Sequence, residues 1–552
     1  MYFFDERAIV GLLAAPFAPL VHWAVRLFYF LVHFAHVAWS WTKEKKVVPR
    51  IGLEPDEQFL LYSAVELAEG IRNKTFSASR VIEAYIRRIE LVNPLLNAVV
   101  QRNYEDARQR ARDLDDYLAV LKPGSDEYQQ ARVQMIENKP LLGVPFTLKD
   151  QFHVKGLRTT AGLACRKDAP LSTEDAGLVE ALRAAGAIPL CISNVPEGLM
   201  HMTSDSAVYG TTNNPYDSRT TCGGSSGGEG ALVAAAASVI GIGSDIGGSI
   251  RIPSLFCGVF GLKPSPGLAD LRGGVPDSLP PSMEEMVGIG PICRYARDLR
   301  TVFKVFIGPK NATRLRLDKP VQLEAVRLFS MAGTGNQLVC PPLDADVLRA
   351  HTTAIEVLEK ATKRSAVPVA FPLAKHAGDF WFAMFAEGGF PISHFFKGFS
   401  KEEKLDLFAE IPRWLRGTSE HTSPAIVSCA MEWFADHFAV FDREQVLKSR
   451  DKLRAQIVEM LADNGVLIWP SFPQAAYVHN ELIWSFLHTE MTAIWNALAL
   501  PAVACPVGLN ADGHPLGVQL VAGPDNERLL IALAEVLEQE LGGWKMPPGP
   551  SA

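Results

Sequence analysis

The centre of this 552-residue chain concentrates glycine and serine in two short segments that could do chemistry. Residues 223–228 read GGSSGG, and residues 245–251 read DIGGSIR. Glycine permits backbone angles that other residues avoid, so successive N–H groups can converge on one point and bind an oxyanion or another anion. Each segment alone is typical of a glycine-rich turn. Together they place serine hydroxyls, which are potential nucleophiles, beside potential oxyanion-binding N–H groups.

The same glycines do not fit a nucleotide-binding loop. In the pattern G-x-G-x-x-G, Gly241 and Gly243 would need a third glycine where Ile246 stands. The motif G-x-x-x-x-G-K-[ST] does not occur in the sequence. The glycine pattern therefore argues against a phosphate-binding function.

A serine nucleophile needs a base, and the sequence offers a lysine for this role. His201 lies near the glycine-rich segments but belongs to no recognisable catalytic pattern. Lys149 ends the apolar run 141–148, and a lysine that burial keeps neutral can accept a proton. The residues alone leave a second interpretation open, in which the ammonium group reaches the surface.

Three residues in this order and at this spacing resemble a known catalytic triad. Lys149, Ser225 and Ser249, separated by 76 and 24 residues, are similar to the Ser–cis-Ser–Lys triad of the amidase signature family. The resemblance covers roughly residues 55–545 and includes the segments 140–145, 252–254, 261–264, 500–502 and 515–520. Segments 239–251 and 261–267, with Ser265 as a marker, are typical of the fatty-acid amide hydrolase branch, and Cys222 departs from the usual pattern.

The resemblance implies a role for each matched residue. Ser249 would be the nucleophile, Ser225 the bridge at a cis peptide bond, and Lys149 the base. The backbone N–H groups of Ile246, Gly247, Gly248 and Ser249 would form the oxyanion hole. Four residues would support this machinery, namely Gly224, Ser226, Asp245 and Arg251, the last two as an ion pair. Leu199, Met200 and Met202 would line the substrate pocket.

The elements that position these residues follow from hydrophobic patterning. Residues 79–90 place apolar side chains on one helical face, and residues 103–136 are charge-rich and helical, with a break at Pro123-Gly124. From residue 140 onward, short β-like runs alternate with helices, which predicts an α/β fold with a largely parallel sheet. The resemblance implies the amidase signature fold instead, a large twisted mixed sheet that helices cover on both faces.

The N-terminus differs in composition from the rest of the chain. Residues 8–41 contain no Asp or Glu and a single Arg, which is enough apolar length for a membrane span, although Pro16 and Pro19 would kink it. We expect residues 1–50 to form a membrane anchor with a basic flank, followed by a catalytic domain at 55–545. A cleaved signal and a surface-lying amphipathic helix are the alternatives. The basic flank favours a cytosolic body, whereas sequons at Asn73 and Asn311 would matter only in a lumen.

Composition excludes several classes of protein. The formal charge is -7, with no basic stripe, which argues against a nucleic-acid partner. The eight cysteines are isolated, and no C-x-x-C or H-E-x-x-H motif occurs, so neither a dense disulfide scaffold nor a common zinc site is indicated. No metal or organic cofactor is implied. Many relatives dimerise, so the resemblance allows a homodimer.

We therefore expect a membrane-associated serine amidase of an intracellular membrane, such as the endoplasmic reticulum or a lipid droplet. Its lipid amide substrates would be long-chain N-acylethanolamines and primary fatty amides, because the anchor accompanies an aromatic-rich segment at 380–441 that could line an acyl channel. Alternatives are an amidase or carboxylesterase for smaller aryl or peptide substrates, an amidotransferase subunit, and a catalytically silent membrane-bound binding protein.

Overall fold

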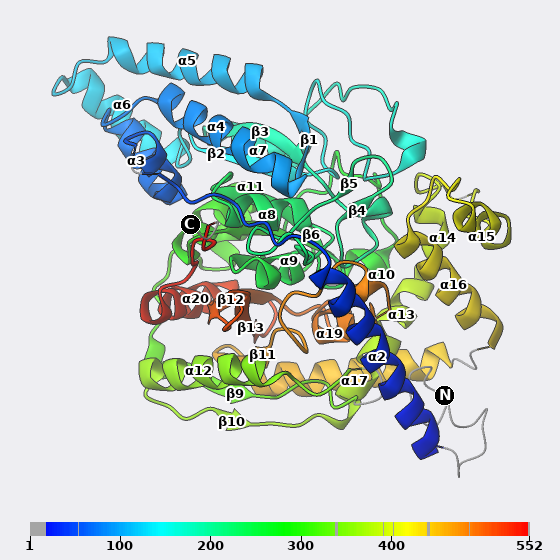
Figure 1. Cartoon of the computed structure of the whole chain (residues 1–552). Coiled ribbons are helices and arrows are strands. Elements are labelled where there is room, and N and C mark those ends of the chain that lie inside the picture. Colours follow the sequence, from blue (N-terminus) through cyan, green and yellow to red (C-terminus); the bar gives the residue numbers. More distant parts are fainter. Residues whose placement is uncertain are drawn as a thin grey trace.

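The computed structural model describes residues 18–52, 54–336, 340–389, 391–400, 402–438, 442–484 and 486–549. Within these residues, eleven strands form one sheet (Figure 1). In spatial order they are β1 (Val99–Arg102), β3 (Ile188–Ser193), β2 (Pro145–Lys149), β6 (Ile240–Asp245), β8 (Gly288–Cys293), β7 (Phe260–Lys263), β12 (Ala502–Leu509), β13 (Pro515–Ala522), β11 (Gly465–Pro470), β9 (Arg327–Ser330) and β10 (Val367–Pro368). A separate pair consists of β4 (Asp205–Ser206) and β5 (Gly210–Thr211).

The direction of the strands is mixed. Strands β3, β2 and β6 are parallel to one another, as are β11, β9 and β10, but all pairings from β6 through β8, β7, β12 and β13 to β11 are antiparallel. The prediction of a largely parallel sheet is therefore wrong for the middle of the sheet. Residues 510–514 alone join β12 to β13, and a parallel crossover needs a dozen or more residues. The mixed sheet agrees with the fold that the family resemblance implied.

Helices cover both faces of the sheet. The side chains of β11, which point alternately to the two faces, illustrate this. Val466 and Ile468 belong to one apolar core, which includes side chains of α11 (Ala296–Arg314) and α20 (Glu527–Leu541). Leu467 and Trp469 belong to a second core with side chains of α9 (Arg251–Phe256), α13 (Ala377–Glu387), α17 (Arg443–Leu461) and α19 (Glu490–Ala497). Since side chains alternate across a strand, this pattern requires helices on both faces (Figure 1).

The other helices complete these layers. The α-helices are α2 (Ala18–Trp41), α3 (Ala64–Arg72), α4 (Ala78–Leu96), α5 (Tyr104–Val120), α6 (Asp126–Asn138), α7 (Gly177–Ala184), α8 (Gly227–Ala234), α10 (Pro281–Glu284), α12 (Ala345–Thr362), α14 (Ile392–Phe395), α15 (Leu407–Leu415), α16 (Ser423–Phe438) and α18 (Glu481–Trp484). Short 3₁₀ helices are η2 (Glu57–Leu61), η3 (Ala164–Arg166), η4 (Glu197–Leu199), η5 (Leu323–Ala325), η6 (Pro372–His376) and η7 (Phe486–Thr489).

The helices predicted near the N-terminal side of the body are present. Helix α4 contains the predicted segment and buries its apolar face, and its N-cap is Ser77, whose side chain accepts a hydrogen bond from the Arg80 N–H. Helices α5 and α6 are separated at Pro123-Gly124, as predicted. The charge-rich sequence thus forms two helices because the Pro-Gly pair interrupts the helical hydrogen bonding.

The predicted membrane anchor is not supported by the structure. Residues 1–17 of this anchor lie outside the described residues, and residues 18–41 form α2. In the described part of the chain, we find no helix that combines the length and the apolar character needed to cross a bilayer. The sequence of α2 contains Arg26, His33 and His36, and such residues are costly in hydrocarbon. His33 Nδ1 lies 2.7 Å from Glu481 Oε1 of α18, so α2 is attached to the body.

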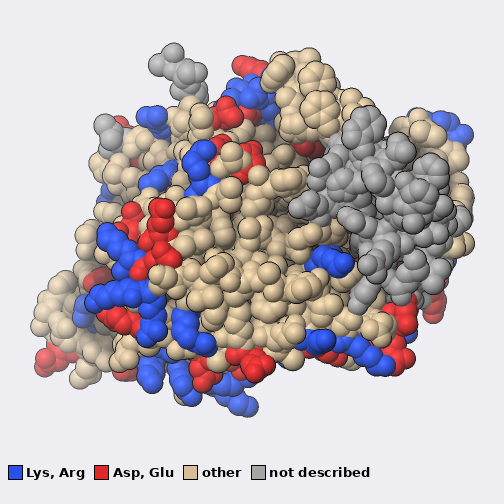
Figure 2. Space-filling view, turned by 90° about the horizontal axis from the view of Figure 1, so that it is seen from below, with Lys and Arg blue, Asp and Glu red and all other residues tan. Residues whose placement is uncertain are grey.

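Positively and negatively charged residues are intermixed on the face of the molecule that Figure 2 shows from below. Figure 2 shows Lys and Arg interspersed with Asp and Glu toward the edges of this face, around a centre of other residues. A nucleic acid would require a continuous basic surface. This face therefore offers no such surface.

Candidate active site

The sheet brings the three predicted catalytic residues to one place. Lys149 is the last residue of β2, and Ser249 lies in the loop between β6 and α9. Strands β2 and β6 are parallel neighbours, so their carboxyl ends lie at the same edge of the sheet. Ser225 precedes α8, which packs against both strands. Residues separated by up to 100 positions therefore meet around the ends of two strands.

Lys149 is fully buried and hydrogen-bonded at its amine. Its Nζ donates to Ser225 Oγ at 2.7 Å and to Ser244 Oγ at 2.9 Å. Burial lowers the pKa of Lys149 to about 7, although the charges of Asp245 and Glu229 raise it. A substantial fraction of Lys149 is therefore neutral at pH 7 and able to accept a proton.

The turn that carries Ser225 needs glycine for steric reasons. The Gly224–Ser225 peptide bond is cis. A Cβ atom on Gly224 would lie 2.6 Å from the Thr203 carbonyl oxygen and 2.8 Å from that of His201. Ser226, the next residue, is buried and donates its hydroxyl to the Ser244 carbonyl at 3.3 Å. Gly224 thus lets this turn approach the neighbouring backbone, while Ser226 joins the turn to β6.

Ser249 is partly exposed, in contrast to Lys149 and Ser225. Its carbonyl accepts a hydrogen bond from the Ser226 N–H at 3.1 Å, which joins the two serine-bearing turns. Among the described residues, no hydrogen bond joins the Ser225 and Ser249 hydroxyls. Within the predicted triad, the Lys149–Ser225 hydrogen bond is thus formed in this structure, while Ser249 lines the pocket.

The loop from β6 to α9 has its carbonyl groups held from outside. The carbonyl of Ile246 accepts from Trp381 Nε1 at 2.7 Å, and that of Gly247 accepts from Thr492 Oγ1 at 2.6 Å. Asn496 Nδ2 donates to the Asp245 carbonyl at 3.0 Å. These donors come from α13 and α19, so two helices on the second core orient the loop backbone.

The amide groups of this loop differ from one another. The Gly248 N–H donates to Asp245 Oδ1 at 2.7 Å and is therefore engaged. Among the described residues, the N–H groups of Ile246, Gly247 and Ser249 have no hydrogen-bond acceptor. Of the four predicted oxyanion-hole donors, three are thus unoccupied, and Gly248 instead holds the carboxylate that shapes the turn.

Asp245 and Arg251 form a buried, bidentate ion pair across the same loop. Arg251 Nε lies 3.0 Å from Asp245 Oδ2, and a second guanidinium nitrogen lies 3.0 Å from Oδ1. Burial raises the pKa of Asp245, but the charge and hydrogen bonds of Arg251 outweigh it and lower the pKa to about 2. Arg251 also donates to the Thr492 carbonyl, Gln519 Oε1 and Asn496 Oδ1. The pair therefore joins the loop to β13 and α19.

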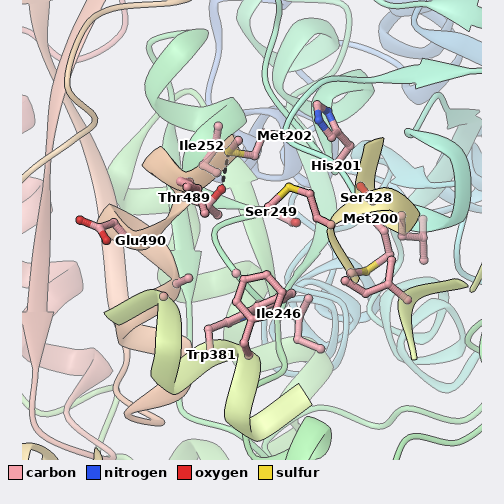
Figure 3. Close-up of a pocket in the computed structure, with 18 residues that line it drawn as sticks. Met200, His201, Met202, Ile246, Ser249, Ile252, Trp381, Ser428, Thr489 and Glu490 are labelled. Carbon is pink, nitrogen blue, oxygen red and sulfur yellow. Dashed lines mark hydrogen bonds between the residues drawn. The ribbon is translucent and has the colours of Figure 1, made fainter. Parts of the chain in front are cut away.

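A pocket lined mainly by apolar side chains reaches Ser249. Leu199, Met200 and Met202, which the family resemblance assigned to the substrate pocket, line it, and Figure 3 labels Met200 and Met202 among the lining residues. Figure 3 shows Ser249 among mainly apolar side chains, with Trp381 and Ile246 nearby. The lining residues are Leu199, Met200, His201, Met202, Ile246, Gly247, Ser249, Ile252, Gly378, Trp381, Phe382, Ile392, Ser428, Met431, Leu487, Thr489, Glu490 and Ala493.

Two titratable groups line this pocket, and burial shifts both toward the neutral form. Burial lowers the pKa of His201 to about 4. Burial raises the pKa of Glu490 to about 8, and its carboxyl group accepts from Thr334 Oγ1 at 2.5 Å and from Asn336 Nδ2 at 3.3 Å. At pH 7 the pocket wall is therefore mainly uncharged.

Several residues at the site were not predicted from the sequence. Trp381, Thr492 and Asn496 hold the loop, and Ser244 contacts Lys149. Ser244 directly precedes a predicted site residue, and Trp381 belongs to the aromatic-rich segment, which are weak signals. Thr492 and Asn496 stand in an ordinary helical sequence. Groups of His, Cys, Asp or Glu arranged to bind a metal ion are not found among the described residues.

Comparison with known proteins identifies the class. The amidase family model matches residues 80–531, so the chain belongs to the amidase signature family of hydrolases, which act on carbon–nitrogen amide bonds. The chain is 38% identical over 499 residues to fatty-acid amide hydrolase 2 of Homo sapiens, covering 89% of this chain and 91% of that protein. It is 39% identical over 496 residues to fatty-acid amide hydrolase 2-A of Danio rerio, covering 88% and 90%.

A solved structure of a fatty acid amide hydrolase has the same fold. Its TM-score is 0.68, its sequence is 22% identical, and the comparison covers 89% of this chain and 87% of that chain. The α/β amidase signature fold with a large mixed sheet flanked by helices is thus confirmed.

Proposed function

We propose that this protein is a membrane-associated serine amidase that hydrolyses long-chain fatty-acid amides, including N-acylethanolamines and primary fatty amides, to a fatty acid and an amine. One observation carries the proposal, namely a mainly apolar pocket that leads to Ser249 and is mainly uncharged at pH 7. The similarity to proteins named fatty-acid amide hydrolase 2 supports the same substrate class.

The charge of the pocket favours an apolar substrate over a polar one. A charged substrate such as an amino acid would need a partner of opposite charge, because an unpaired charge is costly to bury. The described lining residues supply no permanently charged side chain. Met200, Met202 and Met431 contribute flexible thioether side chains, which adapt to acyl chains of different shape.

The first step of the reaction forms a tetrahedral intermediate on Ser249. Neutral Lys149 takes the proton of Ser225, and Ser225 takes the proton of Ser249 as the Ser249 Oγ attacks the substrate carbonyl carbon. The Ser225–Ser249 hydroxyl contact has to form in the substrate complex, because catalytic hydrogen bonds commonly tighten there. The N–H groups of Ile246, Gly247 and Ser249 stabilise the oxyanion, each contributing about 3–4 kcal/mol.

The next steps form the acyl-enzyme and release the products. Protonated Lys149 returns its proton through Ser225 to the departing amine as the carbon–nitrogen bond breaks, which leaves the fatty acyl group on Ser249. Water then attacks the ester with the same residues as base and acid. The fatty acid leaves, and Ser249 regains its proton.

Exposed apolar side chains on α2 support membrane association without a span. Leu27, Phe30, Leu31 and Phe34 are exposed large apolar residues on this helix. A helix of this kind can lie in the membrane interface. Since α2 is attached to α18, close to the pocket residue Leu487, such an interface would bring the lipid phase near the substrate site.

A covalent probe tests the nucleophile and the substrate class together. Detergent-solubilised protein is treated with a fluorophosphonate, with and without a long-chain N-acylethanolamine, and the labelled residue is mapped by mass spectrometry. We expect label on Ser249, suppressed by the lipid amide, and neither label nor turnover in a folded Ser249→Ala variant.

Other outcomes would contradict parts of the proposal. Label on Ser249 that a small aryl amide suppresses and the lipid does not would favour an amidase or esterase for smaller substrates. Folded wild-type protein that takes no label would favour a catalytically silent binding protein. Normal hydrolysis by Ser249→Ala would refute the nucleophile assignment.

A further inference from the structure

A chain of hydrogen bonds leads from the Lys149 amine to two side chains outside the catalytic triad. Lys149 Nζ donates to Ser244 Oγ at 2.9 Å, and Ser244 Oγ donates to Gln151 Oε1 at 2.5 Å. Ser244 is the penultimate residue of β6, and Gln151 follows β2 by two residues. Ser244 is buried, and neither residue lines the pocket that reaches Ser249.

The direction of these hydrogen bonds is determined by Gln151. A carboxamide oxygen can only accept a hydrogen bond, so the Ser244 hydroxyl proton points at Gln151. The Ser244 oxygen therefore presents a lone pair to Lys149 and accepts one of its N–H groups. The Ser244 carbonyl, 3.5 Å from Nζ, is a second acceptor on the same side of the amine.

The arrangement matters because a neutral lysine has two N–H groups and a single lone pair. If both N–H groups are directed at Ser244, the lone pair is left facing the Ser225 Oγ, 2.7 Å away. In that orientation the nitrogen can form a new N–H bond as the Ser225 O–H bond breaks. The resulting ammonium keeps its two bonds to Ser244 and donates its third proton back to Ser225.

We propose that Ser244 and Gln151 are positioning residues that orient the lone pair of neutral Lys149 toward Ser225. This inference rests on the proposed function, because it assigns Lys149 the role of base. The Gln151 backbone N–H donates to the Lys149 carbonyl, but among the described residues the Gln151 side chain is bonded to Ser244 and not to the Lys149 amine. It acts by preventing the Ser244 hydroxyl from turning round and donating its proton to the lone pair that the reaction needs.

The first test measures kcat and KM for a long-chain N-acylethanolamine. Ser244→Ala and Gln151→Met are each expected to lower kcat by roughly tenfold to a hundredfold. This loss is part of the rate acceleration of about 10²- to 10⁴-fold that a general base contributes. KM should change little, because neither side chain lines the pocket. Ser244→Thr keeps the hydroxyl group and should retain kcat within about threefold of wild type.

A matched control removes a different buried hydroxyl. Ser254 lies on α9, and its Oγ donates to the Ile250 carbonyl at 2.7 Å without contacting Lys149. Ser254→Ala should therefore keep the wild-type kcat, which would show that loss of a buried serine hydroxyl does not by itself reduce catalysis.

The double variant separates orientation from simple loss of packing. If Gln151 acts only through Ser244, then Ser244→Ala combined with Gln151→Met should cost no more in kcat than Ser244→Ala alone. If each residue merely stabilised the fold, the two losses would multiply. Circular dichroism and thermal unfolding of every variant establish that the folded protein is being compared.

The pH dependence of kcat/KM distinguishes positioning from a purely structural role, because a purely structural role would leave the apparent pKa unchanged. The Ser244 oxygen stabilises the ammonium form of Lys149, so Ser244→Ala should shift the acidic limb of kcat/KM to lower pH by about one unit. The acidic groups acting on Lys149 are Asp245 at the end of β6 and Glu229 on α8, and burial raises the pKa of Glu229 to about 7. Both remain in the variants, so they would not cause the shift.

The inference and the proposed function fail in different ways. Wild-type kcat in both Ser244→Ala and Gln151→Met, with Lys149→Ala inactive, would overturn the orientation mechanism and leave the triad in place. Full activity of Lys149→Ala or Ser249→Ala would overturn the triad itself. Multiplicative losses in the double variant, or an unmoved acidic limb, would also contradict the proposed roles.

Discussion

At the scale of single residues, burial gives Lys149 its chemistry. The interior destabilises the ammonium form, while Asp245 and Glu229 stabilise it, and the balance places the pKa of Lys149 at about 7. Hydrogen bonds to two serine side chains satisfy the amine without supplying a direct carboxylate partner. A carboxylate in contact with Nζ would keep the lysine charged and unable to accept a proton.

This balance predicts how activity depends on pH. Only the neutral form of Lys149 accepts a proton, so kcat/KM should fall as the pH drops below about 7 and reach a plateau above it. Lys149→Ala should lose most activity at pH 7 and recover part of it at high pH, where hydroxide can deprotonate the nucleophile. Kinetics of amide hydrolysis between pH 5 and pH 10 would measure both.

A second buried lysine serves as the control for this profile. Burial also lowers the pKa of Lys263 to about 7, but its Nζ donates to the Pro264 carbonyl and contacts neither serine of the triad. Lys263→Met should therefore keep the inflection, provided that the variant folds. An inflection that disappears in Lys263→Met and persists in Lys149→Ala would show that the wrong lysine was assigned.

At the scale of elements, the loop between β6 and α9 is held from several directions. Trp381 on α13 and Thr492 on α19 hold its carbonyl groups, while Arg251 pairs with Asp245 across its base. The carbonyl groups of the loop are thus committed to α13 and α19. The loop is held through these carbonyl groups and the ion pair. The N–H groups of Ile246, Gly247 and Ser249 are not used to hold it, so they stay available for an oxyanion.

The ion pair predicts a large loss of stability when one partner is removed. Arg251→Leu leaves the carboxylate of Asp245 buried and unpaired, so the free energy of unfolding should fall by about 3–5 kcal/mol. Urea-induced unfolding would measure the loss. Arg314, which pairs with Asp525 at the surface, provides the control, and Arg314→Leu should cost less than about 1 kcal/mol. Equal losses in the two variants would contradict the bracing role of Arg251.

At the scale of the whole molecule, α2 connects the N-terminal segment to the catalytic body. Phe30 and Phe34 stack along the helix, and their side chains are 63% and 61% exposed. His33 is paired with Glu481 of α18, and this contact raises the pKa of His33. One face of α2 is therefore attached to the protein while apolar side chains remain accessible.

Membrane association should depend on these accessible side chains. Replacing Phe30 and Phe34 by serine should move the protein from the pellet to the supernatant when it is sedimented with phosphatidylcholine vesicles, because apolar burial drives interfacial binding. Tyr117→Ser on α5 removes an exposed aromatic residue elsewhere and should leave binding unchanged. Wild-type protein that stays in the supernatant would contradict the proposed membrane association.

Local sequence patterns were enough to predict much of this molecule. Helix α4, the break between α5 and α6, and the strand that ends at Lys149 follow from apolar periodicity and from a Pro-Gly pair. The order and spacing of Lys149, Ser225 and Ser249, together with the short sequence segments around them, indicated the family. Pairing direction in the middle of the sheet did not follow, since strand neighbours are chosen by tertiary packing.

The sequence by itself was therefore enough to predict which residues could react, and only the tertiary structure decided how they are held. Thr492 and Asn496 hold a loop more than 240 positions away, and no local pattern can predict such a contact. Engagement of the Gly248 N–H by Asp245 depends on the exact path of the loop backbone. The state of Lys149 likewise depends on burial by β2, β6 and α8, and desolvation is a property of the whole packed interior.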